Sequence, residues 1–158
     1  VVLNTNCPEV ACDATGAQAA WLEADLAGSD ALCTLAYGHH PRFSSGHHGD
    51  FDPIDDLYAV LYEYGVDVYL AGHDHHYEHT SRLDPNAAAM ANGVRNFVVG
   101  TGGKSLRPGT VSPKASTHAW DDSTYGILRL DLNAASYGWE FIAEGEGGFT
   151  DSGRTPCR

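Results

Sequence analysis

The sequence predicts an α/β fold in which a parallel part is followed by an antiparallel part. Between positions 31 and 71, an apolar stretch, an amphipathic helix and a second apolar stretch follow one another. This order is typical of two parallel strands joined by a right-handed crossover. Nearer the C-terminus, residues 125–132 and 136–144 alternate apolar and polar side chains, which indicates antiparallel strands with one buried face. No repeat or long linker divides the 158 residues, so we expect a single domain, residues 1–158.

The N-terminal region predicts a strand and then a helix. Residues 1–5, VVLNT, have the composition of a short buried strand. In residues 16–28, GAQAAWLEADLAG, the spacing of Ala19, Leu22 and Leu26 places them on one helical face, and Gly28 ends the helix.

The parallel unit comes next. It consists of a strand over residues 31–37, a loop, a helix and a strand over residues 66–71. Asp52 can cap this second helix, Pro53 suits its first position, and Gly65 ends it. The buried face is predicted from the helical spacing of Ile54, Leu57, Leu61 and Tyr64.

The antiparallel part begins with a strand, VRNFVV at 94–99, that enters the glycine-rich turn GTGG at 100–103. Leu128, Leu130 and Leu132 alternate with charged residues in the next strand. Residues 136–144 repeat the alternation, and the short stretch NAAS at 133–136 fits a hairpin loop between the two strands.

Charge and cysteine content limit the partners and the compartment. The formal net charge is -12 with only 9 Lys and Arg residues, which disfavours nucleic acid as a partner. No apolar run approaches the roughly 20 residues that cross a membrane. Cys7 and Cys12 flank a short loop, so we favour a local disulfide there and a second one between Cys33 and Cys157. Disulfides predict a secreted, extracellular protein; the alternative is four reduced thiols in a cytosolic chain.

Histidines are concentrated in one part of the chain. Eight of the nine lie between residues 39 and 79. His39 and His40 follow one apolar stretch and a glycine, and His73, His75 and His76 follow the next. Because parallel strands bring their carboxyl ends to one edge of a sheet, we expect both clusters in one crevice. We expect His39, His73 and His75 to converge on one metal-sized point, with ring nitrogens of His39 and His73 within about 5 Å. Neutral imidazole is a common metal ligand, which favours a metal site over solvated loop histidines.

The loop between these clusters, RFSSGHHGDF, adds His47 and His48. A histidine near a metal is suited to protonate a leaving group because its pKa lies near neutrality. The alternative is a polar surface loop. Ser44 and Ser45 could contact a phosphate oxygen, although serines are common in turns for other reasons.

The stretch GHHPRFSSGHHG followed by AGHDHHYE resembles the calcineurin-like metallophosphoesterases, in particular the purple acid phosphatase branch and its secreted bacterial relatives. The resemblance extends through four further stretches, WLEADLAGSDALCTLAY, NFVVGTGGKSL, YGILRLDL and FTDSGRTPC. It implies a metal-dependent hydrolase of phosphoric esters, most simply phosphomonoesters. The implied fold is the C-terminal half of a metallophosphoesterase β-sandwich flanked by helices.

The resemblance also implies residue roles. His39 and His73 match ligands of one metal ion, and His75 matches a ligand of a second. His47 or His48 matches the histidine that contacts substrate and donates a proton, whereas His40 and His76 match no ligand. The implied cofactors are two divalent or trivalent ions of zinc, iron or manganese. Where the family has Tyr-Glu-Arg, this chain has Tyr77, Glu78 and His79, which puts one structural salt bridge in doubt.

The family draws its other ligands from Asp-x-His, Gly-Asp and Gly-Asn-His motifs, and none of them occurs upstream of His39. Together with a first residue that is Val1 rather than Met, this leads us to expect a partial catalytic domain. The expected partners are a phosphoester substrate and either the N-terminal half of the domain or a self-association partner, with no nucleic acid and no membrane. The alternative is a non-catalytic metal-binding or self-assembling fragment.

Overall fold

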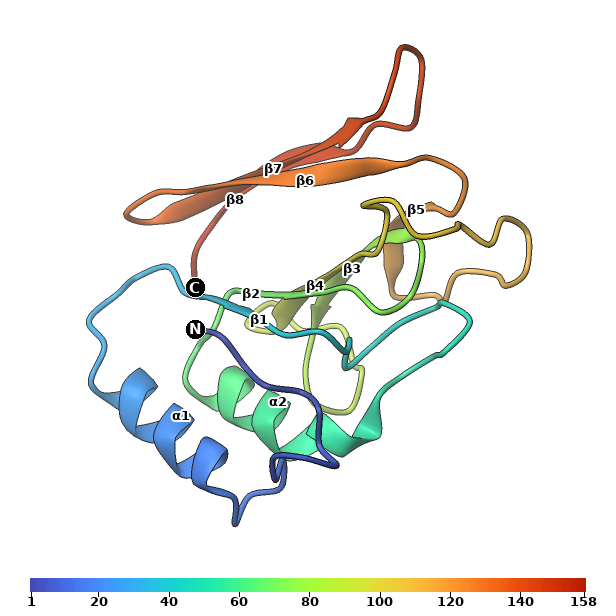
Figure 1. The fold of residues 1–158 in the computed structure, drawn as a ribbon. Helices are drawn as coiled ribbons and strands as arrows, with labels where there is room; N and C mark the ends of the chain where they lie inside the picture. Colours follow the sequence, from blue (N-terminus) through green and yellow to red (C-terminus); the bar gives the residue numbers. More distant parts are fainter.

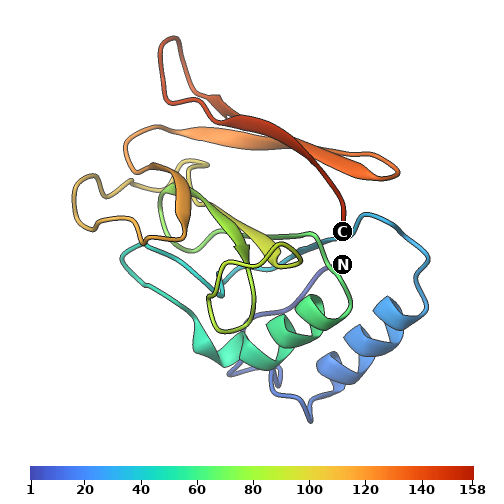
Figure 2. The same cartoon turned by 180° about the vertical axis from the view of Figure 1, so that it is seen from behind.

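The computed structural model describes residues 1–158 as three layers, seen in Figure 1 and from behind in Figure 2. Two α-helices form one outer layer, a five-stranded sheet lies in the middle, and a three-stranded sheet forms the other outer layer. One apolar core, with Leu22, Leu57 and Leu61, lies between the helices and the middle sheet, and a second, with Phe97, Tyr137 and Phe141, lies between the two sheets. The predicted fold class is confirmed.

The middle sheet combines parallel and antiparallel strands in the order β1-β2-β4-β3-β5. β1 (Leu35–Tyr37), β2 (Val68–Ala71) and β4 (Val94–Val99) run parallel. β3 (Tyr77–Leu83) runs antiparallel to β4, and β5 (Thr117–Asp121) pairs antiparallel with β3. The carboxyl ends of β1 and β2 therefore lie next to each other, as the strand–helix–strand pattern predicted.

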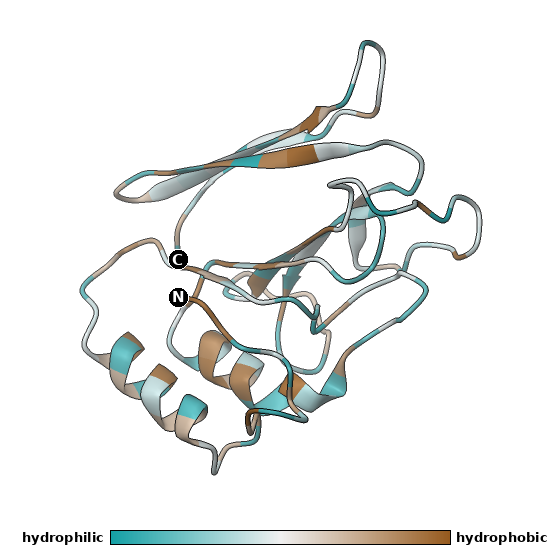
Figure 3. Cartoon of the chain, viewed as in Figure 1, coloured by the Kyte–Doolittle hydropathy of each residue, from teal (hydrophilic) through white to brown (hydrophobic).

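The helices cover one face of this sheet. α1 (Ala17–Ala27) buries Ala19, Leu22 and Leu26 and ends at Gly28, as predicted. A 3₁₀ turn, η1 (Asp52–Ile54), leads into α2 (Asp55–Glu63), whose apolar side appears brown in Figure 3. The predicted cap is wrong, because Asp52 lies inside the 3₁₀ turn and its carboxylate contacts Arg42 instead.

The third layer is the antiparallel sheet β6-β7-β8. β6 (Gly126–Leu132) and β7 (Ser136–Ala143) form the predicted hairpin, in which the Asn133 N–H donates to the Ser136 carbonyl over 2.8 Å. β8 (Ser152–Pro156) pairs with β7. Tyr137 and Phe141 are buried against Val68, Tyr77 and Phe97 of the middle sheet.

Several strands differ from the prediction. Residues 1–5 form only an isolated bridge from Val2 to Tyr37, because the chain then turns into the disulfide-closed loop. The strand expected over residues 31–37 begins at Leu35, since the Thr34 N–H donates to the Asp67 carboxylate rather than to a neighbouring strand. β3, β5 and β8 were not predicted. β3 is buried on both faces and β8 has little apolar content, so neither shows the alternation that marked β6 and β7.

Both expected disulfides are present, with Cα atoms 5.4 Å apart in Cys7–Cys12 and 5.3 Å apart in Cys33–Cys157. The second bond joins the end of the chain to the segment that enters β1. Among the helices of the structure, none is long and apolar enough to pass through a bilayer.

Candidate metal centre

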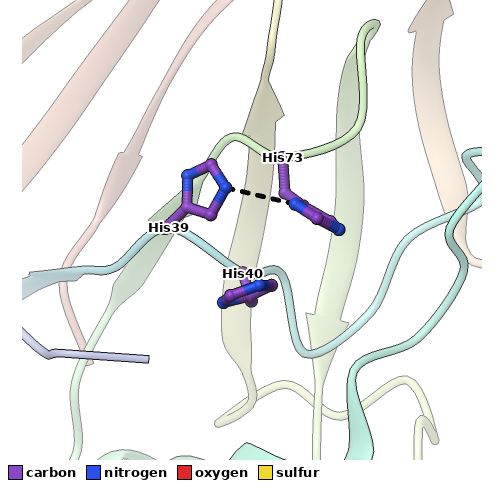
Figure 4. A group of neighbouring side chains, drawn as sticks. All are labelled: His39, His40 and His73. Carbon is purple, nitrogen blue, oxygen red and sulfur yellow. Dashed lines mark hydrogen bonds between the residues drawn. The ribbon is translucent and has the colours of Figure 1, made fainter. Parts of the chain in front are cut away.

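Two histidines face each other where β1 and β2 end. The parallel hydrogen bonding continues past both strands, because the Gly38 N–H donates to the Leu70 carbonyl (3.1 Å) and the Gly72 N–H donates to the His39 carbonyl (3.0 Å). This pairing brings His39 Nε2 to 3.1 Å from His73 Nδ1, as Figure 4 shows. Two nitrogen ligands of one ion, each about 2.1 Å from it, lie about 3 to 3.5 Å apart. The expected proximity of the two rings is confirmed.

The backbone of His73 is unusual. Its φ is +63°, in the left-handed region that non-glycine residues rarely adopt. The Asp74 N–H donates to the Gly72 carbonyl over 2.7 Å, so residues 72–74 have the hydrogen bond and the φ of a classic γ-turn, which is rare and strained. Strained residues of this kind cluster at functional sites, and here the turn directs the His73 ring toward His39.

A third imidazole, that of His40, completes a group whose ligand nitrogens, together with those of His39 and His73, all lie within 4.8 Å of one another. His40 stacks on Phe51 with ring centroids 4.1 Å apart. The Thr5 hydroxyl lies 3.0 Å from His40 Nδ1 and accepts the backbone N–H groups of His39 and His40. No sequence pattern predicted this role for Thr5, because it lies 35 positions from His40 and only the fold brings the two together.

Burial and repulsion from neighbouring histidines favour neutral rings at His40 and His73. The pKa of His40 and the pKa of His73 are both lowered, first by burial and then by the neighbouring histidines. A metal ion binds the neutral form of imidazole, so rings that are already deprotonated release no proton when they bind it.

His75 lies in the same cavity but outside the group of three. It lines an open cavity of about 490 Å³ together with His39, His48, His73 and Lys104. We call this the histidine cavity. His75 Nδ1 lies 2.8 Å from the Ser105 carbonyl, which can only accept, so Nδ1 carries the proton and Nε2 keeps its lone pair. Such a second contact is what fixes the tautomer of a metal-binding histidine.

The two loop histidines face different spaces. The His48 ring lines the histidine cavity, with its centroid 4.3 Å from that of His73. His47 instead lines a smaller neighbouring pocket with His75, His76 and Arg107. The structure therefore brings His48, and not His47, next to the paired rings.

Two buried carboxylates fix this loop. Asp74 accepts the Ser44 hydroxyl (2.5 Å) and the His48 backbone N–H (2.9 Å). Glu78 accepts the Ser45 backbone N–H (2.8 Å) and hydroxyl (2.7 Å). A phosphate contact by Ser44 or Ser45 is ruled out, because both side chains are buried and their hydroxyls donate hydrogen bonds to these carboxylates.

Close packing explains two glycines beside Asp74. A Cβ on Gly46 would lie 2.3 Å from the Asp74 carboxyl carbon, and one on Gly100 would lie 1.8 Å from the Asp74 carbonyl oxygen. Any side chain at either position would displace the motif that carries His73 and His75.

The residues in place of the family's Tyr-Glu-Arg form their own network. Asp151 Oδ2 accepts hydrogen bonds from the Tyr77 hydroxyl (2.6 Å), His79 Nδ1 (2.7 Å) and the Trp139 indole (3.0 Å). At the position of the family's arginine, His79 thus makes a hydrogen bond to Asp151. This contact joins the middle sheet to the outer one.

A second cavity, about 390 Å³, opens between the two sheets. It is lined by Tyr37, Leu70, Val99, Ile127 and other mainly apolar or glycine residues. It contains no histidine and no carboxylate, so it lacks the metal ligands that line the histidine cavity.

Comparison with known proteins agrees with this geometry. The sequence profile described as "Calcineurin-like phosphoesterase" matches residues 3–77, the segment that ends just after the second histidine cluster. Residues 3–77 thus match the calcineurin-like phosphoesterase family, and the chain has purple acid phosphatase relatives. It is 35% identical over 114 residues to Purple acid phosphatase 17 of Arabidopsis thaliana. It is 35% identical over 83 residues to Tartrate-resistant acid phosphatase type 5 of Oryctolagus cuniculus, a match that covers 51% of this chain and 25% of the relative.

The fold is also that of a solved member of the calcineurin-like phosphoesterase family. The purple acid phosphatase PPD1 from yellow lupin (Lupinus luteus) seeds superimposes with a TM-score of 0.82 at 24% identity, over 97% of this chain and 30% of the lupin chain. The match to the Arabidopsis protein covers 69% of this chain but 32% of the relative. The chain thus spans about a third of the length of these relatives.

Proposed function

We propose that this chain supplies the imidazole side of a two-metal centre that hydrolyses phosphomonoesters. The observation that carries the proposal is the His39–His73 pair, whose ring nitrogens are 3.1 Å apart at the ends of adjacent parallel strands. The donor set fits zinc, iron or manganese, all of which accept imidazole nitrogen. His75, through Nε2, is the ligand for the second ion, as the family pattern implies.

The chain's own residues have distinct tasks in this reaction. Bound ions would lower the pKa of a water molecule and offset negative charge on the phosphoryl oxygens. His48 protonates the leaving alkoxide, because its ring faces the histidine cavity beside His73. Asp74 positions His48 by accepting its backbone N–H. Carboxylate ligands come from the upstream aspartate motifs of the family.

Two disulfides and a net charge of -12 support an extracellular location for this activity.

Metal stoichiometry and phosphate release test the proposal together. Neutral imidazoles offset none of the repulsion between two cations, which carboxylate ligands normally do. We therefore expect residues 1–158 alone to bind at most one ion per chain and to release little phosphate from an aryl phosphate. Adding an upstream segment with the aspartate motifs should give two ions per chain and turnover, measured by elemental analysis and phosphate assay. Full turnover by residues 1–158 alone would show that carboxylates within this chain, such as Asp50, complete the site.

A second candidate is a metal-binding module without catalysis. The observation in its favour is the group of His39, His40 and His73, whose ligand nitrogens lie within 4.8 Å of one another. Three imidazoles can bind one zinc ion without a carboxylate. This candidate predicts one tightly bound ion and no phosphate release even when the upstream segment is present.

A further inference from the structure

Two cations of this chain have no polar partner for their side chains, and both lie beside the candidate metal centre. The chain has 9 Lys and Arg residues. Seven have a side chain in a hydrogen bond or ion pair: Arg42, Arg82, Arg95, Lys114, Arg129, Arg154 and Arg158. The side chains of Lys104 and Arg107 make no such contact.

Both cations belong to the loop between β4 and β5, residues 102–116. This segment holds three cations and no Asp or Glu, in a chain whose net charge is -12. Its third cation, Lys114, is paired with Asp50 over 2.6 Å. The loop is therefore a cationic segment in an acidic protein, and two of its charges are available.

The loop is fastened to the site at two points. The Ser105 carbonyl lies 2.8 Å from His75 Nδ1. The Lys114 N–H donates to the Ser45 hydroxyl over 2.9 Å, and Ser45 is held by Glu78. Lys104 directly precedes the first point and Arg107 lies between the two, so the attachments keep both near the histidines.

The cavities confirm this placement. Lys104 lines the histidine cavity with His39, His48, His73 and His75. Arg107 lines the neighbouring pocket with His47, His75 and His76, and His75 borders both spaces. At about 490 Å³ the histidine cavity is in the size range of small-molecule sites, so it has room for more than one phosphoryl group.

We propose that Lys104 and Arg107 form a second anion-binding subsite, which selects phosphomonoesters whose leaving group carries another phosphate. This inference rests on the proposed function. Guanidinium matches phosphate with two parallel hydrogen bonds, and ammonium acts as a point charge. Two carboxylates also border the Arg107 pocket, but Asp122 accepts the Gly109 N–H and Asp74 accepts Ser44 and His48.

A matched pair of non-hydrolysable ligands tests the subsite by binding alone. Propylene-1,3-bisphosphonate carries the second anionic group, and propylphosphonate lacks it. Calorimetry on the full-length, metal-loaded protein measures the two affinities. The bisphosphonate should bind about 10-fold tighter than propylphosphonate, or more, as expected for charge-assisted hydrogen bonds. In the variant Lys104→Gln/Arg107→Gln, this preference should shrink to within about 3-fold.

Arg154→Gln is the control, because it removes the same charge from an exposed side chain that contacts only Ser136 on the outer sheet; it should keep the preference. Equal affinity of the unmodified protein for both ligands, or an equal loss for both in the double variant, would overturn the subsite.

Turnover of propane-1,3-diyl bisphosphate and propyl phosphate, measured in parallel, separates the two proposals. Hydrolysis without a preference for the bisphosphate refutes the subsite and leaves the proposed function intact. A binding preference without hydrolysis of either ester supports the subsite and refutes the proposed function.

Discussion

His73 shows how one residue combines strain and chemistry. Its φ of +63° is imposed by hydrogen bonds on both sides, from Gly72 to the His39 carbonyl and from Asp74 to the Gly72 carbonyl. Such a conformation costs of the order of 1 to 3 kcal/mol. It persists because the surrounding structure fixes it, and it places the ring 3.1 Å from His39.

Replacing His73 by Ala should abolish the shared ion site. Loss of one of two facing nitrogen ligands should lower the zinc affinity by about 100-fold or more. The reason is that removing even a residue that only hydrogen-bonds to a metal ligand lowers metal affinity by about 10- to 100-fold. Calorimetry of zinc binding measures the change. His118→Ala is the control, since His118 is exposed and contacts Ser81 rather than the cavity. Unchanged zinc affinity in His73→Ala would exclude His73 as a ligand.

The two loop histidines should differ in the metal-loaded enzyme. His48→Ala should lower kcat by about 10² to 10⁴-fold, the range for a general acid, whereas His47→Ala should change it by less than about 10-fold. The reason is that only His48 lines the cavity with His39 and His73. Steady-state kinetics on an alkyl phosphate, which has a poor leaving group, provides the measurement. A larger loss in the His47 variant would reverse the assignment.

At the scale of elements, β3 connects the site to the rest of the molecule. Its first residues follow the second histidine cluster directly, and their side chains point to both sides. Glu78 fixes the histidine loop, while Tyr77 and His79 contact Asp151 next to the outer sheet. Burial raises the pKa of Glu78, but hydrogen bonds from His76, Ser45 and Thr117 lower it by more, so the carboxylate stays ionised.

Asp151 should make stability depend on pH in the acid range. Burial raises the pKa of its carboxyl, but the hydrogen bonds from His79, Tyr77 and Trp139 lower it by more, so the pKa lies below its ordinary value. Its contribution is therefore complete above the unfolded pKa, near 3.9, and is lost as pH falls through the folded pKa.

The free energy of unfolding in urea, measured from pH 5 to pH 2, checks this expectation. Asp151→Asn should be less stable than the unmodified protein at pH 5, and the difference should shrink toward pH 2. Asp131→Asn is the control, because Asp131 is exposed and pairs only with Arg129. A difference that stays constant over this range would contradict the assigned role of the ionised carboxylate.

At the scale of the whole molecule, Cys33–Cys157 joins residues 124 positions apart and Cys7–Cys12 joins residues 5 apart. The entropy that a disulfide removes from the unfolded chain grows with the length of the closed loop. Replacing Cys33 and Cys157 by Ala should therefore cost about 4 to 5 kcal/mol of unfolding free energy, and replacing Cys7 and Cys12 about 2 kcal/mol. Urea unfolding of the two double variants makes a matched comparison. Equal losses of unfolding free energy in the two variants would mean that contacts in the folded state, and not loop closure in the unfolded chain, account for most of the stabilisation by these disulfides.

Features that depend on neighbouring residues could be predicted from the sequence. The period of apolar side chains predicted α1, α2 and the β6–β7 hairpin, and the position of each histidine cluster after an apolar strand predicted that His39 and His73 meet at one sheet edge. Both features follow from local geometry, because the spacing of side chains along a helix or strand fixes which face they share.

The remaining features depend on the tertiary structure. It shows that His48, and not His47, lines the histidine cavity, and that Thr5 contacts His40. It also shows that Ser44 and Ser45 donate to buried carboxylates. Lys104 and Arg107 lie beside the cavity without polar partners for their side chains. β3, β5 and β8 were likewise visible only in the fold, since β3 is buried on both faces, β8 has little apolar content, and β5 pairs with β3 across a long loop. The physical reason is that hydrogen bonds and burial between distant segments depend on how the layers pack, and no local pattern of residues encodes that packing.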